Sequence, residues 1–146
     1  TRDGRTFRML KFRTMRHDAE EESGPVWAQA NDARCTPIGL WLRRYSLDEL
    51  PQLWNVLRGD MSLVGPRPER PYFVRKFAGE MCYYDGRHSV RTGITGWAQA
   101  NGLRGNTSIE LRTLYDLYYI EHWSAWFDLK IIFLTLREFL FHQSAY

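Results

Sequence analysis

The chain has 146 residues, of which 44% are hydrophobic and 25% charged, so it can bury one hydrophobic core, and a largely disordered chain is excluded. Its formal net charge of +3 suits a phosphate ligand, a nucleic acid or an anionic membrane surface, and does not choose between them. Two cysteines, Cys35 and Cys82, are too few for a disulfide framework and fit a reducing compartment such as the cytoplasm.

The first part of the chain predicts a strand, a loop and then helices. Thr6–Met15 is rich in Phe, Met and Leu with interleaved basic residues, which is typical of a strand with one exposed face. Arg16–Pro25 is acidic and predicts a loop with some helical tendency, and we expect disorder only near Asp18–Gly24. Turn residues and helix ends then predict a turn at Asn31–Pro37, a short helix at Ile38–Tyr45 and a helical stretch at Ser46–Arg58, interrupted by Pro51 and ended by Gly59.

The second part predicts an extended connector, a loop and further helices. Ser62–Pro71 carries three prolines and is expected to be extended and stiff. A helix is predicted at Tyr72–Tyr83, followed by a loop with five glycines at Tyr84–Gly105. The spacing of Thr107–Glu110 matches a capping box, which predicts a helix through about Glu121.

The last segment, Trp123–Phe141, predicts a helix rich in Trp, Phe, Ile and Leu. Four charged residues interrupt it, namely Asp128, Lys130, Arg137 and Glu138, and a membrane-spanning helix does not readily tolerate four charges. A helix lying in the membrane interface and a helix packed on the protein core both explain the pattern, and the sequence leaves both open. Together, the elements predict a single α+β domain over residues 1–146, mostly helical, with a short N-terminal strand region and long functional loops.

Two adjacent carboxylates, Asp48 and Glu49, are the first candidate for chemistry. The plain alternative is a helix start, with Ser46 as N-cap and Glu49 closing a capping box. Pro51 weakens that alternative, because a proline inside a helix costs roughly 3 kcal/mol. A kink that displays two acids at a helix end would explain the proline. Neighbouring helical side chains point about 100° apart, so the two acids suit different roles, such as nucleophile and metal ligand or proton carrier.

Arg67 is the second candidate, because Pro66 and Pro68 fix the backbone on both sides of it. A guanidinium held in this way is suited to bidentate contact with a phosphate. A rigid connector that carries a solvated arginine is the alternative. Lys11 and Arg13 share one face of the predicted strand and could meet an anionic ligand, although a solvent-facing pair explains them as well.

These stretches together resemble the bacterial sugar transferases, also called monotopic phosphoglycosyl transferases, of the undecaprenyl-phosphate glucose or galactose phosphotransferase type. The resemblance runs along nearly the whole chain as several long motifs in the same order. They are Lys11–Met15, Asp32–Gly39, Leu42–Arg58, Gly59–Pro68, Arg87–Gly105 and Tyr115–Asp128.

The resemblance implies a role for each matching residue. Asp48 matches the family's nucleophile, which attacks the sugar-bearing phosphate of a UDP-hexose, releases UMP and carries the sugar phosphate covalently. Glu49 matches the second acid, implicated in Mg²⁺ binding or in activating the acceptor. Arg67, between Pro66 and Pro68, matches the motif associated with the nucleotide end of the donor. Two basic positions match residues that contact phosphates, Lys11 and Arg43. Gln99, Arg104 and the glycine-rich loop around them are candidates for sugar recognition, although a structural loop that uses Gly for its backbone angles explains them as well.

The resemblance also implies where the protein acts. The acceptor is undecaprenyl phosphate, and the reaction is the first membrane step of exopolysaccharide, capsule or O-antigen synthesis. It takes place at the membrane surface, on the cytoplasmic face of the bacterial inner membrane, with no nucleic acid partner, and an oligomer is compatible with it. Family members carry a hydrophobic re-entrant helix before the first predicted strand. The chain begins with a turn and no initiator Met, so we expect it to be a fragment lacking that helix.

Three alternative functions predict other sequence features. A basic nucleic-acid-binding module would not place Asp48, Glu49 and Asp60 among its arginines. A catalytically inactive interaction domain would show erosion of the acid pair or of the basic positions. A glycosidase needs two carboxylates at least about 5 Å apart across a glycosidic bond, which sequence neighbours rarely provide.

Overall fold

The computed structural model of the chain describes residues 2–21, 24, 26, 32–105 and 107–141. Helices dominate, and two short strands form a parallel sheet, so the predicted α+β class is confirmed. The α-helices and strands are α1 (Pro37–Arg44), α2 (Gln52–Leu57), β1 (Ser62–Val64), α3 (Pro71–Glu80), β2 (Gly93–Thr95), α4 (Trp97–Ala100), α5 (Ile109–Glu121) and α6 (Ala125–Phe141). The 3₁₀ turns are η1 (Arg2–Gly4), η2 (Leu47–Glu49) and η3 (Tyr84–Ser89).

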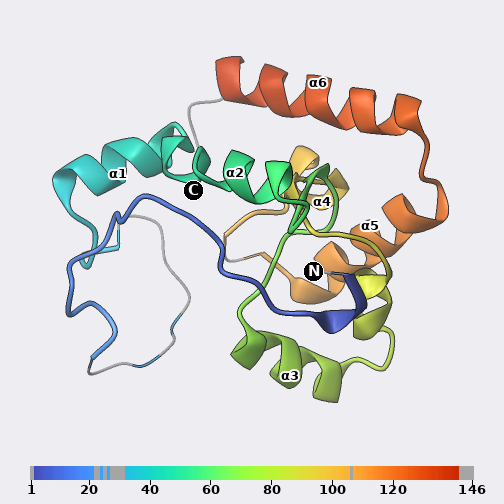
Figure 1. Cartoon of the computed structure of the whole chain (residues 1–146), viewed down its shortest axis with the longest axis horizontal. Helices are drawn as coiled ribbons and strands as arrows, with labels where there is room; N and C mark the ends of the chain where they lie inside the picture. The colour runs from blue at the N-terminus through green and yellow to red at the C-terminus, as the bar shows by residue number, and fades with distance from the viewer. Residues whose placement is uncertain (1, 22–23, 25, 27–31, 106, 142–146) are drawn as a thin grey trace.

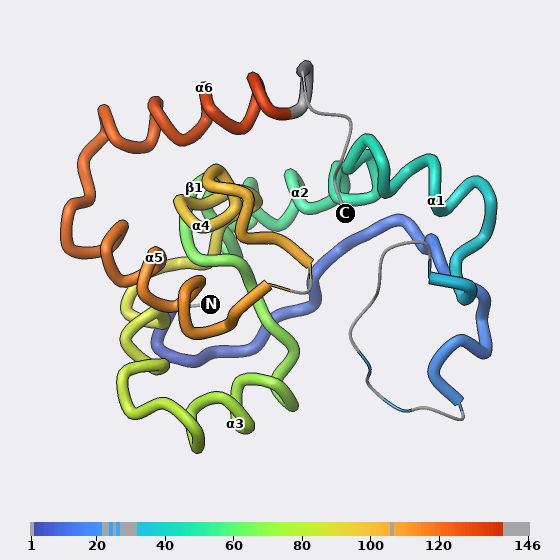
Figure 2. Tube along the Cα trace, turned by 180° about the vertical axis from the view of Figure 1, so that it is seen from behind, coloured from blue at the N-terminus to red at the C-terminus, as the bar shows by residue number. Residues whose placement is uncertain are grey.

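The helices lie on two sides of the molecule (Figure 1), and strand β1 of the small sheet lies between α6 and α3 (Figure 2). Helix α6 runs along one side of the molecule and contacts α4 and both strands, and α3 lies on the opposite side. The view from behind shows the same order, with α1 and α2 on the half of the molecule that also carries α6 (Figure 2). The arrangement therefore leaves α1, α2 and α6 facing away from α3.

The sheet depends on glycines at its closest backbone contacts. The two strands pair in parallel, with Ser62 opposite Gly93 and Val64 opposite Thr95. A Cβ atom at Gly93 would overlap the backbone of Gly65, so only glycine allows this approach. The predicted loop at 84–105 is therefore wrong. It contains η3, β2 and α4, because some of its glycines mark close backbone contacts rather than turns.

The buried core lies where α5 and α6 meet the sheet. Val64, Tyr119 and Ile131 form its centre, with exposed fractions of 4%, 3% and 0%. Partly buried side chains pack around them, including Trp97 and Phe127, whose ring centroids lie 5.0 Å apart. One face of α6 is thus a core face, as one of the two open alternatives for this helix required.

Most predicted helices are confirmed with small shifts at their ends. Helix α1 ends one residue before the predicted Tyr45, and α3 ends at Glu80 rather than Tyr83. Helix α6 begins at Ala125, where the Ser124 hydroxyl accepts a hydrogen bond from the backbone N–H of Phe127. The expected extended connector before α3 holds up to Arg70, and its first residues form β1.

The predicted cap of α5 is displaced by one residue. Ser108, not Thr107, caps the helix, and its hydroxyl accepts from the N–H of Leu111 at 3.3 Å. The Thr107 hydroxyl instead accepts from Nε of the buried Arg112 at 2.9 Å. The predicted end at Glu121 is confirmed.

The predicted strand at Thr6–Met15 is wrong. The segment is extended, but it has no strand partner, and only Met15 forms an isolated bridge, with Cys35. Two of its backbone groups bond to the side chain of Asn55. The Asn55 Oδ1 accepts from the N–H of Leu10 at 2.9 Å, and the Asn55 Nδ2 donates to the carbonyl of Arg8 at 2.9 Å. The buried side chain of Asn55 on α2 therefore makes hydrogen bonds that a neighbouring strand would otherwise make.

The predicted acidic loop is only partly described. Residues 17–21 form turns, whereas 22, 23 and 25 lie outside the described residues, as does most of the stretch before Asp32. In the part of the chain that the structure describes, no helix is long and apolar enough to cross a membrane.

Candidate active site

The acid pair lies on a 3₁₀ turn between two helices. Ser46 adopts a left-handed conformation (φ 48°) and makes no side-chain cap, so the capping-box alternative is wrong. Asp48 and Glu49 follow on η2, and Pro51 then immediately precedes α2. Pro51 costs little there, because the first helical N–H groups have no partner within the helix. The predicted interruption of the helical stretch at Pro51 is confirmed, because the acids lie on η2 and the regular helix α2 begins only after Pro51.

Glu49 is held by two cations from distant parts of the chain. Its Oε1 lies 2.7 Å from Lys11 Nζ and 2.7 Å from Arg67 Nη2. Burial alone would raise the pKa of this carboxyl, but the charges of Arg67 and Lys11 outweigh it and lower the pKa to about 2. Glu49 is therefore a fixed anion, and the solvent-facing alternative for Lys11 is wrong, because its ammonium meets the acid pair.

Asp48 lies in a different environment from its neighbour. It is 5% exposed, and its Oδ2 lies 3.9 Å from Lys11 Nζ. Its backbone carbonyl accepts from the N–H of Phe12 at 3.0 Å, which ties η2 to the N-terminal segment. Burial raises the pKa of Asp48, while Lys11 opposes the shift and Glu49 adds to it. The two acids thus differ in charge environment, as different roles require.

A cavity of about 200 Å³ gathers most of the predicted site residues. Its lining includes Asp48 and Glu49 together with three arginines, Arg43, Arg67 and Arg104. Gln99 lines it as well, and its amide donates to the carbonyl of Ile94 at 3.1 Å. Residues from five separate stretches of sequence therefore meet at one site.

The remaining predicted residues lie around this cavity. Arg43 Nε donates to the Thr14 hydroxyl at 2.8 Å, which fixes its guanidinium beside the N-terminal segment. Pro66 is fully buried, and Pro68 lines a neighbouring cavity that Lys11 also lines. The two prolines thus flank Arg67 without entering the first cavity.

The sequence missed several lining residues. Thr135 reaches the cavity from α6, and its hydroxyl lies 2.7 Å from that of Thr95 on β2. Leu50 and Leu53 supply apolar lining next to the acid pair. Thr135 is 40 residues from its partner in sequence and belongs to no motif, so no local signal could have identified it.

The carboxylates of the site fit a Mg²⁺ ion that takes most of its ligands from the phosphates of a bound substrate. Among the described residues, no group of three or more His, Cys, Asp or Glu side chains is arranged to hold a metal ion. Magnesium commonly takes only one or two carboxylate ligands and completes its shell with phosphate oxygens and water. Within the part of the chain that the structure describes, Glu49 Oε2 has one long contact, of 3.5 Å to Arg67, so this oxygen would be the ligand of a magnesium ion.

Comparison with known proteins shows the family of this chain. A family model described as bacterial sugar transferase matches residues 1–142. The chain belongs to this family. The motif resemblance is thereby confirmed, and neither a nucleic-acid-binding module nor an inactive interaction domain is favoured.

Several similar bacterial sugar transferases have curated names. The UDP-glucose:undecaprenyl-phosphate glucose-1-phosphate transferase of Xanthomonas campestris pv. campestris is 49% identical over 148 residues, covering 98% of this chain and 30% of that protein. The undecaprenyl-phosphate glucose phosphotransferase of Komagataeibacter xylinus is 46% identical, covering 99% and 28%. The UDP-N-acetylgalactosamine-undecaprenyl-phosphate N-acetylgalactosaminephosphotransferase of Aeromonas hydrophila is 45% identical, covering 93% and 32%. The chain spans about a third or less of the length of these three relatives.

Proposed function

We propose that the protein transfers a hexose 1-phosphate from a UDP-hexose to undecaprenyl phosphate and releases UMP. The observation that carries the proposal is the cavity lined by a buried carboxylate, Asp48, and by a second acid, Glu49, which two cations fix. The names of the relatives supply the substrate class, and they include glucose and N-acetylgalactosamine, so the hexose stays open.

The reaction proceeds in two displacements at phosphorus. An oxygen of Asp48 attacks the phosphorus that bears the hexose, and the bond from that phosphorus to the bridging oxygen breaks, so UMP leaves. An oxygen of undecaprenyl phosphate then attacks the same phosphorus, and the bond to Asp48 breaks, which restores the carboxylate. A carboxylate needs no general base, and the raised pKa of Asp48 increases its nucleophilicity. Arg43, Arg67 and Lys11 bind the phosphates and offset their charge.

Glu49 is the residue that would hold Mg²⁺, through Oε2. A bound magnesium ion would offset the charge of the donor diphosphate. Glu49 itself orients Lys11 and Arg67 through contacts of 2.7 Å each, so it organises the cations around the phosphates.

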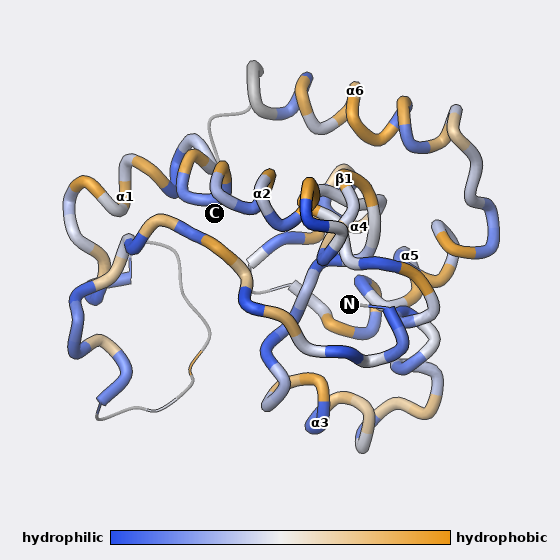
Figure 3. The backbone as a smooth tube through the Cα atoms, in the orientation of Figure 1, coloured by the Kyte–Doolittle hydropathy of each residue, from blue (hydrophilic) through white to orange (hydrophobic). Residues whose placement is uncertain are grey.

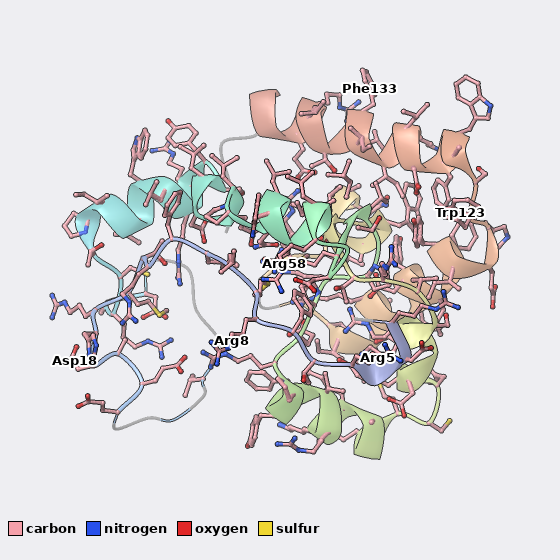
Figure 4. The ribbon with its side chains drawn as sticks, viewed as in Figure 1. Arg5, Arg8, Asp18, Arg58, Trp123 and Phe133 are labelled. Carbon is pink, nitrogen blue, oxygen red and sulfur yellow. The ribbon has the colours of Figure 1, made fainter. Side chains whose placement is uncertain are left out.

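The lipid acceptor lies in a membrane, and the helices on the α6 side are suited to contact a membrane surface. Large apolar side chains are exposed on three helices there, among them Trp41 (55%), Trp54 (58%), Trp126 (82%) and Phe133 (67%). Figure 4 shows Phe133 projecting from α6 away from the rest of the chain. Hydrophobic residues recur along α6, broken by polar ones (Figure 3). This supports a helix that packs one face on the core and places another in the membrane interface. The proposed reaction takes place at the cytoplasmic face of the inner membrane.

Intact-protein mass spectrometry with a panel of UDP-hexoses and Mg²⁺, without acceptor, tests the proposal. The protein in nanodiscs should gain the mass of one hexose phosphate and release a stoichiometric amount of UMP. Asp48→Asn should abolish both. Asp85→Asn, which changes an acid that is 74% exposed in its side chain, is the matched control and should behave as the wild type.

The outcomes separate the possible mechanisms. Turnover that requires undecaprenyl phosphate, with no adduct before its addition, would favour direct transfer over the covalent route. Release of free hexose without UMP would indicate a glycosidase. No reaction with any UDP-hexose, with or without acceptor, would contradict the proposed activity.

A further inference from the structure

The segment that carries Lys11 buries little apolar surface. Its large apolar side chains are exposed, namely Met9 (40%), Leu10 (40%) and Phe12 (53%). Among the described residues it also pairs with no strand, so hydrogen bonds decide where its backbone lies. Its position matters to the site, because Lys11 Nζ reaches Glu49 at 2.7 Å. The place of this ammonium therefore depends on a small number of polar contacts.

Two of these contacts come from one amide side chain. Asn55 is 1% exposed on α2, and it accepts the N–H of Leu10 and donates to the carbonyl of Arg8, each at 2.9 Å. These backbone groups belong to residues two apart, so in an extended chain they point to the same side. An amide offers the donor and the acceptor of one peptide group, so Asn55 binds both groups as a residue of a parallel strand would.

Asp60 fixes the orientation of this amide. Its Oδ2 accepts from Asn55 Nδ2 at 3.2 Å and lies 3.6 Å from Arg58 Nε. An ionised carboxylate and the carbonyl of Arg8 only accept hydrogen bonds, whereas the N–H of Leu10 only donates. All three partners therefore require the same orientation of the amide, and an aspartate or leucine of similar size would lack the donor.

The anchored backbone groups lie directly beside Lys11. Leu10 precedes it, and Phe12 follows it with an N–H that donates to the Asp48 carbonyl at 3.0 Å. A shift of the segment by one residue would move its backbone by about 3.3 Å and place an apolar side chain where Lys11 now meets the acids. Asn55 opposes this shift, because the two backbone groups that it binds would then point away from its amide.

We infer that Asn55 is a positioning residue of the active site, which holds the N-terminal segment in the register that brings Lys11 to the acid pair. The inference deepens the proposed function and rests on it for the role of Lys11 at the phosphates. The acids and Asn55 come from one short stretch of sequence, η2 and α2, so this stretch both carries the acids and holds the cation that meets them.

Acetylation by an N-hydroxysuccinimide ester tests the inference without any turnover. The lysines of the chain are Lys11, Lys76 and Lys130, and peptide mass spectrometry of the protein in nanodiscs gives the rate at each. Asn55→Leu keeps a similar volume and removes both hydrogen bonds. It should accelerate acetylation of Lys11 about tenfold, as expected when hydrogen bonds that hold the segment are lost, and leave the rates at Lys76 and Lys130 unchanged.

Leu10→Pro tests the same contact from the side of the segment. Proline has no backbone N–H, so it removes the hydrogen bond to Asn55 without a change in α2, and it decides the question if Asn55→Leu does not fold. It should accelerate acetylation of Lys11 to a similar extent. Leu10→Ala is the matched control, because it shortens the same exposed side chain and keeps the N–H.

The effect on catalysis should pass through Lys11. Asn55→Leu should lower kcat/KM for UDP-hexose about tenfold in the wild-type background. In a Lys11→Met background the same substitution should cost little further activity, because the ammonium that it positions is already absent. Losses that multiply in the double variant would overturn the inference, since Asn55 would then act by another route.

The acetylation rates separate this inference from the proposed function. Wild-type rates at Lys11 in Leu10→Pro and in a folded Asn55→Leu would overturn the inference. Equal acceleration at all lysines, or the same acceleration in Leu10→Ala, would overturn it too, because neither effect would depend on the Asn55 contact. If the wild type transfers no hexose phosphate, the proposed function fails, yet selective acceleration at Lys11 would still support the role of Asn55.

Discussion

Each acid of the pair owes its charge state to residues that are distant in sequence. Glu49 touches Lys11, 38 residues before it, and Arg67, 18 residues after it. These contacts lower its pKa to about 2, whereas burial raises that of Asp48. Because the chain must fold before the cations reach Glu49, this charge environment also contributes to stability.

Glu49→Gln should make stability less dependent on pH. A carboxyl whose folded pKa is lowered binds fewer protons when folded than when unfolded, so its contribution is complete above its ordinary pKa of about 4.5 and is lost as pH falls toward 2. We expect Glu49→Gln to cost at most about 3 kcal/mol at pH 7, and less at pH 3. Urea unfolding in EDTA at both pH values measures this. The exposed Glu121→Gln is the control, and an equal cost at both pH values would contradict the prediction.

Arg67 is itself positioned by a buried ion pair. Arg87, 3% exposed, donates to the backbone carbonyl of Arg67 at 2.9 Å and contacts Asp116 at 2.7 Å. The Nη1 of Arg87 donates to the hydroxyl of Tyr84 at 2.9 Å. Arg87 therefore fixes the backbone that carries the partner of Glu49, although it does not line the cavity of the acid pair.

Arg87→Lys should reduce UMP release about 10- to 100-fold, because an ammonium cannot keep all these contacts and Arg67 would shift. If Arg87 acts through Arg67, its substitution should cost little further activity in an Arg67→Ala background, while the loss of thermal stability persists. Tyr119→Phe, which removes a buried hydroxyl elsewhere on α5, should lower stability only. Additive activity losses in the double variant would indicate a general structural role.

Among the helices, α1 reaches the site through a contact that only glycine permits. A Cβ atom at Gly39 would overlap the carbonyl of Thr14, and the hydroxyl of Thr14 holds Arg43. Gly39→Ala should therefore cost about 1–3 kcal/mol in urea unfolding and also lower activity. Gly79→Ala on α3, where a Cβ meets nothing within 4 Å, should stabilise by about 0.5–1 kcal/mol. Stabilisation by both substitutions would show that α1 does not need this close contact.

The elements and residues that sequence predicts well are those with local causes. Helices α1, α3, α5 and α6 follow from hydrophobic pattern and end residues, and the acid pair with Arg67 follows from contiguous motifs. The prediction of a strand at the N-terminal segment failed because its composition is typical of a strand, while its hydrogen bonds go to the Asn55 side chain and to isolated backbone groups such as the Asp48 carbonyl. The position of Thr135 at the first cavity, and the neighbouring cavity that Lys11 and Pro68 line, result only from tertiary packing, so no local pattern predicts them.

In the molecule as a whole, the acid pair lies next to two cavities that different elements line. Helices α1, α2 and α6 lie on the side away from α3 (Figures 1 and 2), and each carries exposed large apolar side chains. The first cavity is lined from α2 and α6. The neighbouring cavity, which Lys11 and Pro68 line, is formed by α3 and the N-terminal segment.

The membrane side can be tested with the tryptophans already in the chain. In vesicles that contain brominated lipids, Trp54→Phe and Trp126→Phe should each reduce the quenched fraction of the fluorescence, because these rings are 58% and 82% exposed on α2 and α6. Trp97→Phe is the control, since that ring packs against the core and stacks on Tyr115 at 6.3 Å. Equal effects at all three positions, or quenching that is unchanged by Trp126→Phe, would mean that something other than lipid covers α6.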